Sequence, residues 1–281
     1  MKIINTKNKM KLASRMLKKN NNTIGLVPTM GFLHQGHMSL INCAKMECDK
    51  VVVSIFVNPI QFGQGEDLKN YPKATDSDLA KCKKAGVDIV FLPEEKEMYP
   101  EGFQTYVDVA KVSTHLCGLS RPGHFTGVAT VVLKLLNIVN PDRAYFGEKD
   151  FQQLVVIKRM VSDLDLDTKI VNLPIIREED GLAMSSRNKY LSRHEREKAG
   201  ILYKALKKGE NMIKNGEKNP EKIISVLQEM ILSENIGKID YINICNPYTL
   251  ENLDRISGEI LIAMAVKIGK ARLIDNLLIK A

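Results

Sequence analysis

The sequence predicts an α/β protein in which a doubly wound parallel sheet is followed by a smaller α+β part with an antiparallel sheet. Up to about residue 176, short apolar segments alternate with segments of helical periodicity, as in parallel strands joined by right-handed crossovers. From about residue 177 this alternation stops, and two helical segments precede three strand-like segments. We therefore predict a Rossmann-like domain over residues 1–176 and an α+β domain over residues 177–281.

Apolar patterning and the residues that end each segment predict the elements of the first domain. Residues 23–27 are short and apolar, and Leu40, Ile41 and Ala44 then recur at helical spacing. Glycine or proline stands at most of the later boundaries, as expected for turns. The further predicted strands are 51–57, 87–92, 143–146, 169–173 and 175–176, and the further predicted helices are 76–85, 125–139 and 151–164.

The second domain begins with helices. Ser192 and Glu195 have the spacing of a capping box, which predicts a helix that runs to residue 209 and beyond. Pro220 predicts the start of a second helix, because proline is tolerated in a first turn. Gly269 lies between the last two strands and predicts an antiparallel hairpin. The predicted strands are 239–244, 259–266 and 272–279.

Composition narrows the class of protein. Of the 281 residues, 44% are hydrophobic and 26% are charged, which is ordinary for a globular domain. Residues 1–15 lack the apolar segment of a secretory signal, and apolar runs such as 260–266 are too short to span a bilayer. The five cysteines form no CxxC pair, which indicates free thiols. We expect a cytoplasmic protein without a membrane partner.

The net charge of +8 favours anionic partners. A nucleic-acid-binding surface would require clustered Lys and Arg with interleaved aromatic residues, whereas here the Lys residues are scattered and Trp is absent. We therefore expect small anionic substrates and no nucleic acid.

Two histidines stand where the first strand gives way to the first helix. The segment from Pro28 to His37 ends in His34-Gln-Gly36-His37. A helix N-terminus attracts anions through unpaired N–H groups and its dipole, and Gly36 lets the backbone approach a phosphate. Each imidazole adds a donor that can gain charge near neutral pH. We interpret this segment as a triphosphate site. Taken alone, the tetrapeptide is more often two ordinary histidines at a helix end, and it is its position between strand and helix that favours the functional interpretation.

Three further polar clusters lie after predicted strands or at the domain junction, where open α/β sheets bind ligands. Gly147–Asp150 offers Lys149 to a phosphate, and Gln153 follows one turn later. Residues 58–62 carry two amides, which suit a polar or carboxylate-bearing substrate. Met184–Arg187 carries two hydroxyls and a guanidinium, which can bind a departing pyrophosphate. Each cluster alone is also compatible with an ordinary surface turn.

Together these segments resemble the pantoate–β-alanine ligase family, within the HxGH nucleotidylyltransferase superfamily. Two departures from the family pattern are mild, since Phe32 stands in place of a small Ala and Met38 in place of Leu. The matching segments are 28–37, 58–62, 120–125, 146–153, 181–188 and 271–276.

The resemblance implies a reaction in two steps. Pantoate and ATP would give pantoyl adenylate and pyrophosphate, and the amine of β-alanine would then displace AMP to form pantothenate. It also implies Mg²⁺ with the ATP, closure of the smaller domain over the intermediate, and a homodimer. The sequence assigns no protein ligand to the metal.

The resemblance also implies the site residues. His37 would be the general acid, acting with His34, Lys149 and Arg187 as catalytic residues. Gln61 would contact pantoate and β-alanine, and Gln153 would contact pantoate. Asn58 and Arg121 would play supporting roles. The implied ATP-binding residues are Met30, Gly31, Phe32, Leu33, His34, Gln35, Gly36, His37, Gly147, Glu148, Lys149, Asp150, Ile176, Met184, Ser185, Ser186 and Arg187.

Other functions fit the sequence less well. Another HxGH enzyme, such as phosphopantetheine adenylyltransferase, would not need the second domain, the two amides or the segment 120–125. A class I tRNA synthetase would need a longer chain. A nicotinamide dehydrogenase would require GxGxxG after the first strand, where this chain has Pro28-Thr-Met-Gly31. A basic RNA-binding protein is disfavoured by the clustered phosphate-binding residues.

Overall fold

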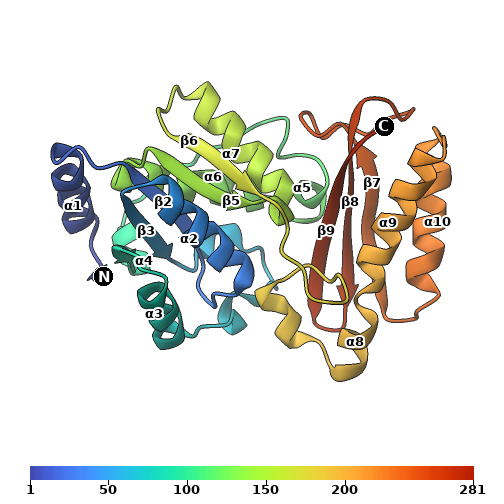
Figure 1. The fold of residues 1–281 in the computed structure, drawn as a ribbon, viewed down its shortest axis with the longest axis horizontal. Helices are drawn as coiled ribbons and strands as arrows, with labels where there is room; N and C mark the ends of the chain where they lie inside the picture. Colours follow the sequence, from blue (N-terminus) through green and yellow to red (C-terminus); the bar gives the residue numbers. More distant parts are fainter.

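The computed structural model describes residues 1–281 as two sheets with their helices (Figure 1). The first sheet is parallel throughout, with strand order β1-β4-β3-β2-β5-β6. Because the chain moves outward from β2 in both directions, the order reverses between β2 and β5, and ligands collect at such a point. The strands are β1 Lys2–Ile4, β2 Ile24–Thr29, β3 Lys50–Ile55, β4 Ile89–Phe91, β5 Arg143–Gly147 and β6 Lys169–Leu173.

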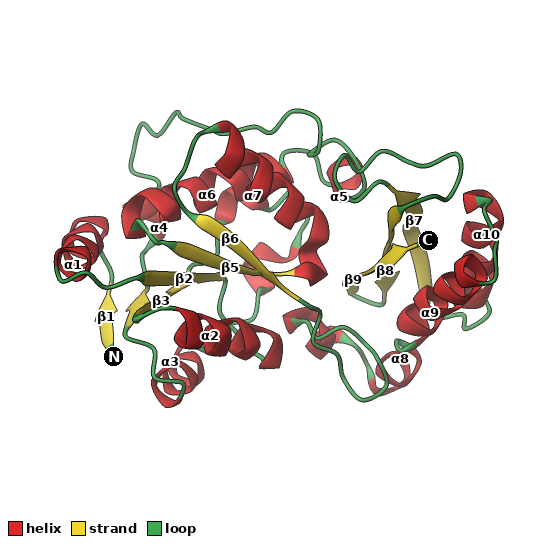
Figure 2. Ribbon diagram, turned by 45° about the horizontal axis from the view of Figure 1, so that its top comes forward, coloured by secondary structure: helices red, strands yellow, loops and turns green.

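Helices cover both faces of this sheet (Figure 2). Helices α6 and α7 pack on one face, where Leu26 and Val52 are buried, and α2 and α3 pack on the other, where Val27 and Val53 are buried. This alternation is the two-residue period of a strand buried on both sides. The helices are α1 Lys7–Lys19, α2 Gln35–Glu47, α3 Thr75–Lys84, α4 Glu95–Met98, α5 Cys117–Ser120, α6 His124–Val139 and α7 Phe151–Asp163.

The second sheet is antiparallel, with strand order β7-β8-β9, and the predicted hairpin turns at Gly269 with φ 53°. One of its faces packs against α9 and α10, and the other adds residues such as Leu261 and Ala263 to the core of the first part. The elements are α8 Arg193–Lys198, α9 Ile201–Lys214, α10 Pro220–Leu232, β7 Gly237–Cys245, β8 Glu259–Ile268 and β9 Ala271–Lys280.

The predicted fold class is confirmed, with local corrections. Strand β1 and helix α1 were not predicted. Residues 175–176 form no strand; Pro174 lacks an N–H for the ladder, and the Ile176 carbonyl accepts from Met184 N at 3.0 Å instead. The helix that begins at the Ser192 capping box stops at Lys198, and α9 begins at Ile201 after Gly200. Glycine weakens a helix, and a Cβ at Gly200 would lie 3.1 Å from the Asp180 carbonyl oxygen.

No helix in the structure has both the length and the apolar character that crossing a membrane requires. The division of the chain at residue 176 stays a prediction.

Candidate active site

The loop after β2 is held by a buried carboxylate. Gly31 and Phe32 adopt left-handed backbone conformations, with φ 84° and 50°. Asp78, on α3 and 1% exposed, accepts from Phe32 N at 2.7 Å and from Leu33 N at 2.8 Å. Lys81 then donates to the Leu33 carbonyl at 2.6 Å. These bonds fix the loop that leads into α2. Sequence reasoning missed Asp78, whose only local signal is an acid in the first turn of a predicted helix.

The two histidines cap α2 reciprocally. Gly36 N donates to His34 Nδ1 at 3.2 Å, and His34 N donates to His37 Nδ1 at 3.2 Å. The ring centroids lie 4.1 Å apart. Since each Nδ1 accepts a hydrogen bond, each neutral ring carries its proton on Nε2. The pair therefore provides two Nε2–H donors beside a helix N-terminus.

Both histidines are neutral at physiological pH. Burial, with the nearby Lys149 charge, lowers the pKa of His34 to about 4. Burial, with the neighbouring His34 and Lys149, lowers the pKa of His37 to about 3. The expectation that these rings gain charge near neutral pH is therefore wrong, because burial and the nearby Lys149 ammonium disfavour a positive charge on either ring.

The turn after β5 supplies the lysine. The short helix η3, Glu148–Asp150, joins β5 to α7, so the turn lies beside the end of β2. Lys149 Nζ lies 3.8 Å from Asp150 Oδ1, and the Lys149 side chain is 20% exposed. Lys149 lines the same cavity as His34 and His37, and its positive charge contributes to lowering the pKa of both rings.

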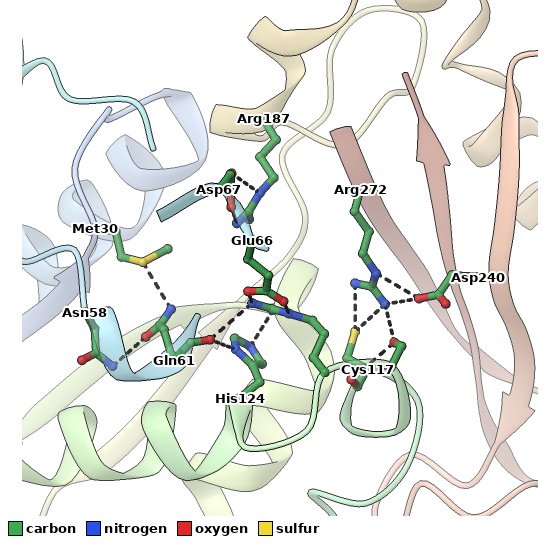
Figure 3. Close-up of polar contacts among 12 residues, drawn as sticks. Met30, Asn58, Gln61, Glu66, Asp67, Cys117, His124, Arg187, Asp240 and Arg272 are labelled. Carbon is green, nitrogen blue, oxygen red and sulfur yellow. Dashed lines mark hydrogen bonds and ion pairs between the residues drawn. The ribbon is translucent and has the colours of Figure 1, made fainter. Parts of the chain in front are cut away.

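A set of hydrogen bonds orients Gln61, which lies on the short helix η1, Pro59–Gln61 (Figure 3). Gln61 Nε2 donates to Met30 Sδ at 3.2 Å, and Gln61 Oε1 accepts from Asn58 Nδ2 at 3.1 Å. Asn58 Nδ2 also donates to the Gly127 carbonyl at 3.1 Å, and Asn58 Oδ1 accepts from Tyr99 Oη at 2.7 Å. The amide of Gln61 is thus held in one orientation before any substrate binds.

Behind Gln61, His124 and Arg121 form a second anchor. Arg121 donates to His124 Nε2 at 2.9 Å, so His124 carries its proton on Nδ1 and donates to the Gln61 carbonyl at 2.8 Å. Burial and the Arg121 charge lower the pKa of His124 to about 4. Arg121 also forms a bidentate ion pair with Glu66, at 2.6 Å for both bonds.

The junction segment supplies Ser185, Ser186 and Arg187. The short helix η4, Ser186–Tyr190, follows Ser185, whose hydroxyl accepts from Arg187 N at 3.2 Å. Arg187 forms a bidentate pair with Asp67, at 2.8 and 3.0 Å, and Ser186 Oγ lies 3.2 Å from Tyr71 Oη (Figure 3 shows the Arg187–Asp67 pair). Sequence reasoning missed Glu66, Asp67 and Tyr71.

These segments meet in one cavity of about 220 Å³, which adjoins a larger cleft of about 1070 Å³ beside the second sheet. Arg121, Lys149 and Arg187 line both. Of the predicted binding residues, the smaller cavity is lined by Met30, His34, Gly36, His37, Gln61, Gly147, Lys149, Asp150, Gln153, Ile176, Met184, Ser185, Ser186 and Arg187.

Five predicted nucleotide residues line neither space. Leu33 is a core residue, the Phe32 ring faces Lys189 Nζ at 4.7 Å, and Glu148 accepts from Asn172 at 2.5 Å. Gly31 lies against Asp78, and Gln35 is exposed. The roles of all predicted residues in binding stay predictions.

Comparison with known proteins identifies the family of this site. The model of the family described as "Pantoate-beta-alanine ligase" matches residues 2–278. The chain belongs to this family. It is therefore an amide-bond-forming ligase of pantothenate biosynthesis, as the resemblance implied.

Relatives and solved structures of the family cover nearly the whole chain. A pantothenate synthetase of Caldicellulosiruptor bescii is 56% identical over 272 residues, covering 97% of this chain and 96% of the relative. A pantothenate synthetase structure from Thermus thermophilus superposes with a TM-score of 0.94 at 44% identity, covering 99% of each chain. A Francisella tularensis pantoate-beta-alanine ligase, complexed with Beta-gamma ATP and Beta-alanine, has a TM-score of 0.83 at 38% identity, covering 99% of this chain and 97% of that one.

Proposed function

We propose that this chain performs both steps of pantothenate formation in the cavity between β2, β5 and the junction segment. The observation that carries this is convergence: His34 and His37, Lys149, and Arg187 line one space of about 220 Å³ although they come from three distant segments. A basic, partly enclosed space with several directed donors suits a triphosphate.

In the first step, a pantoate carboxylate oxygen would attack the α-phosphorus of ATP while the bond to the bridging oxygen of pyrophosphate breaks. Two anions must approach each other, so positioning and neutralisation of charge dominate catalysis. Lys149, the Nε2–H groups and the N-terminus of α2 would neutralise the phosphates, and Arg187 with Ser185 and Ser186 would hold the departing pyrophosphate.

The neutral state of His37 refines its role. A neutral imidazole is a strong hydrogen-bond donor but a weak acid, so a general-acid role requires bound phosphate to raise the pKa of His37 from about 3. We propose that His37 meets the ground-state triphosphate as a neutral donor.

The amides would select the organic substrates. Gln61 keeps one amide hydrogen free beyond the bond to Met30, and Gln153 lines the same cavity. Both can donate to the hydroxyl and carboxylate oxygens of pantoate without adding charge. The β-alanine amine would then attack the acyl carbon of the adenylate, with AMP leaving, and Gln61 would contact this substrate too. The complex of the Francisella tularensis ligase with Beta-alanine supports β-alanine as a substrate.

Asp150 is suited to contribute one ligand to a magnesium ion whose other ligands come mostly from ATP. It is the only acidic residue that lines the smaller cavity, and no group of three or more His, Cys, Asp or Glu side chains could hold a metal ion by itself. Mg²⁺ is commonly bound through one or two carboxylates together with substrate phosphates. When bound, Mg²⁺ would neutralise phosphate charge, and Asp150 would help to hold it.

Pyrophosphate exchange into ATP tests the proposal. We expect exchange that requires pantoate and proceeds without β-alanine, and formation of AMP equal to pantothenate once β-alanine is added. Exchange that ignores pantoate would refute the substrate assignment. Lys158→Ala, on the exposed side of α7 where Lys158 bonds Asn172, is the matched control for substitutions of Lys149 and should retain full exchange.

The proposal also includes a homodimer in the cytoplasm. The family resemblance supports the dimer, and the five free cysteines, four of them buried, support a reducing compartment. Light scattering should give twice the chain mass of 31.6 kDa; the mass of a single chain would refute the dimer.

A further inference from the structure

The segment Ala271–Asn276 belongs to the motifs that match the family, yet the mechanism above gives it no role. It lies on β9, an edge strand of the three-stranded sheet. Three of its side chains are polar, and each reaches a different part of the chain outside that sheet. These are Arg272, Asp275 and Asn276.

Two of the three contacts hold β9 in place. Arg272 donates to Asp240 at 2.6 Å, to Ser120 Oγ at 3.1 Å and to Cys117 Sγ at 3.5 Å, which ties the strand to α5 (Figure 3). Asp275 is 2% exposed and forms a bidentate pair with Arg177 at 2.6 and 2.9 Å. Arg272 and Asp275 thus anchor β9 to α5 and to the segment that follows β6.

The third contact reaches the backbone of the phosphate-binding turn. Asn276 is 6% exposed, and its Nδ2 donates to the Glu148 carbonyl at 2.9 Å and to the Lys149 carbonyl at 3.0 Å. Both hydrogens of this amide are used, so Asn276 has no donor left for a substrate. It holds the two carbonyls on either side of the Lys149 Cα.

We propose that Asn276 is a positioning residue for Lys149. A lysine side chain has four rotatable bonds, so its ammonium can be placed reproducibly only if its backbone is fixed. The β5–α7 connection is the three-residue helix η3, and the Asn276 amide fixes the two peptide groups that carry Lys149. The second sheet thereby sets where the lysine meets the phosphates. The inference rests on the role proposed for Lys149.

A double-mutant cycle tests this. Asn276→Ala should lower pantoate-dependent pyrophosphate exchange by about 10- to 100-fold, as misplacement by up to 1 Å does, mainly by raising the KM for ATP. In a Lys149→Ala background the same change should cost less than about 2-fold, because the group that Asn276 positions is gone. Equal losses in both backgrounds, or no loss in the wild-type background, would overturn the proposal.

Three further measurements separate positioning from stability and from the assigned reaction. Asn276→Ser keeps one donor and should lose less exchange than Asn276→Ala, and it serves if the alanine variant does not fold. Asn243→Ala, on β7, removes an amide that bonds only Asn252 at 2.8 Å and should leave exchange unchanged. Calorimetry can measure ATP binding to the same variants without pantoate. Asn276→Ala should weaken ATP binding in the wild-type background but hardly at all in the Lys149→Ala background, which is the same coupling between the two residues. If wild-type exchange fails but this coupling holds, the proposed reaction is wrong while the role of Asn276 stands.

Discussion

Gly127→Ala should weaken pantoate binding and turnover, because the added methyl group would collide with the backbone of η1. A Cβ at Gly127 on α6 would lie 2.5 Å from the Ile60 carbonyl oxygen, 2.6 Å from Gln61 Cα and 2.7 Å from Gln61 N. Ordinary contact begins near 3.4 Å, so η1 and α6 must separate by about 0.7–0.9 Å. The atoms met are backbone atoms, so no side chain can rotate away.

This separation moves the amide of Gln61 and breaks its bonds to Asn58 and Met30. Misplacement by about 1 Å typically costs up to about 100-fold in rate, and overpacking costs about 1–3 kcal/mol of stability. We expect a raised KM for pantoate, a lower kcat in pyrophosphate exchange and a lower melting temperature, with the KM for ATP nearly unchanged. Steady-state kinetics with each substrate varied in turn measures this.

Gly209→Ala is the matched control. Gly209 lies within α9, as Gly127 lies within α6, so both changes gain the same helix propensity. A Cβ there would meet the side-chain end of Ile262 at 2.9 Å, remote from the cavity. It should change stability without changing the KM for pantoate. If Gly127→Ala keeps normal pantoate kinetics, or if both variants lose activity equally, the argument that α6 positions Gln61 is refuted.

Four further predictions concern the nucleotide half of the site. His37→Ala and Lys149→Ala should each lower adenylate formation by roughly 10²-fold or more with the circular dichroism spectrum unchanged; near-normal exchange in either would remove that residue from the mechanism. Because the pKa values of His34 and His37 are about 4 and about 3, kcat/KM for ATP should show no histidine inflection between pH 5.5 and 8, and an inflection lost in a histidine variant would contradict this. The two histidines have a lower pKa in the folded protein than the value of 6.5 in the unfolded chain, so the unfolded chain binds protons first as the pH falls. The free energy of unfolding should therefore fall as the pH drops from 6.5 toward 4. Denaturant midpoints should show a smaller fall in His37→Gln. Asp78→Ala should lower stability and raise the KM for ATP by freeing the backbone of Phe32 and Leu33; an unchanged KM would show that the loop is held by other contacts.

Five of the six strands of the parallel sheet could be predicted from the sequence, because they are short, mainly apolar runs with Gly or Pro close to their ends. Strand β1 is only three residues long and has no such boundary. The helix at residues 7–19 was missed because six of its residues are Lys or Arg and only Met10 and Ser14 are buried, so its inner face has no clear apolar pattern. Residues 175–176 were misread because two isoleucines suggest a strand, whereas β6 has no partner beyond the Gly147–Leu173 pair.

The candidate site was predictable to the extent that its chemistry lies in contiguous motifs. The ends of β2 and β5 meet because of the sheet order, so the HxGH segment and Lys149 could be placed together in advance. Asp78 and Asp67 could not be found, because they act on partners 46 and 120 residues away. The neutral histidines were missed for the same reason: their pKa depends on burial and on a lysine from another segment.

The reciprocal caps at the start of α2 have a consequence for mutagenesis. Each ring both caps the first turn of the helix and lines the cavity, so alanine at either position removes a local helix cap together with the imidazole, even where the overall fold is kept. Asparagine is a favoured cap residue and can accept from Gly36 N, yet it has no ring to present to a ligand. His34→Asn is therefore the replacement that can report on the imidazole alone.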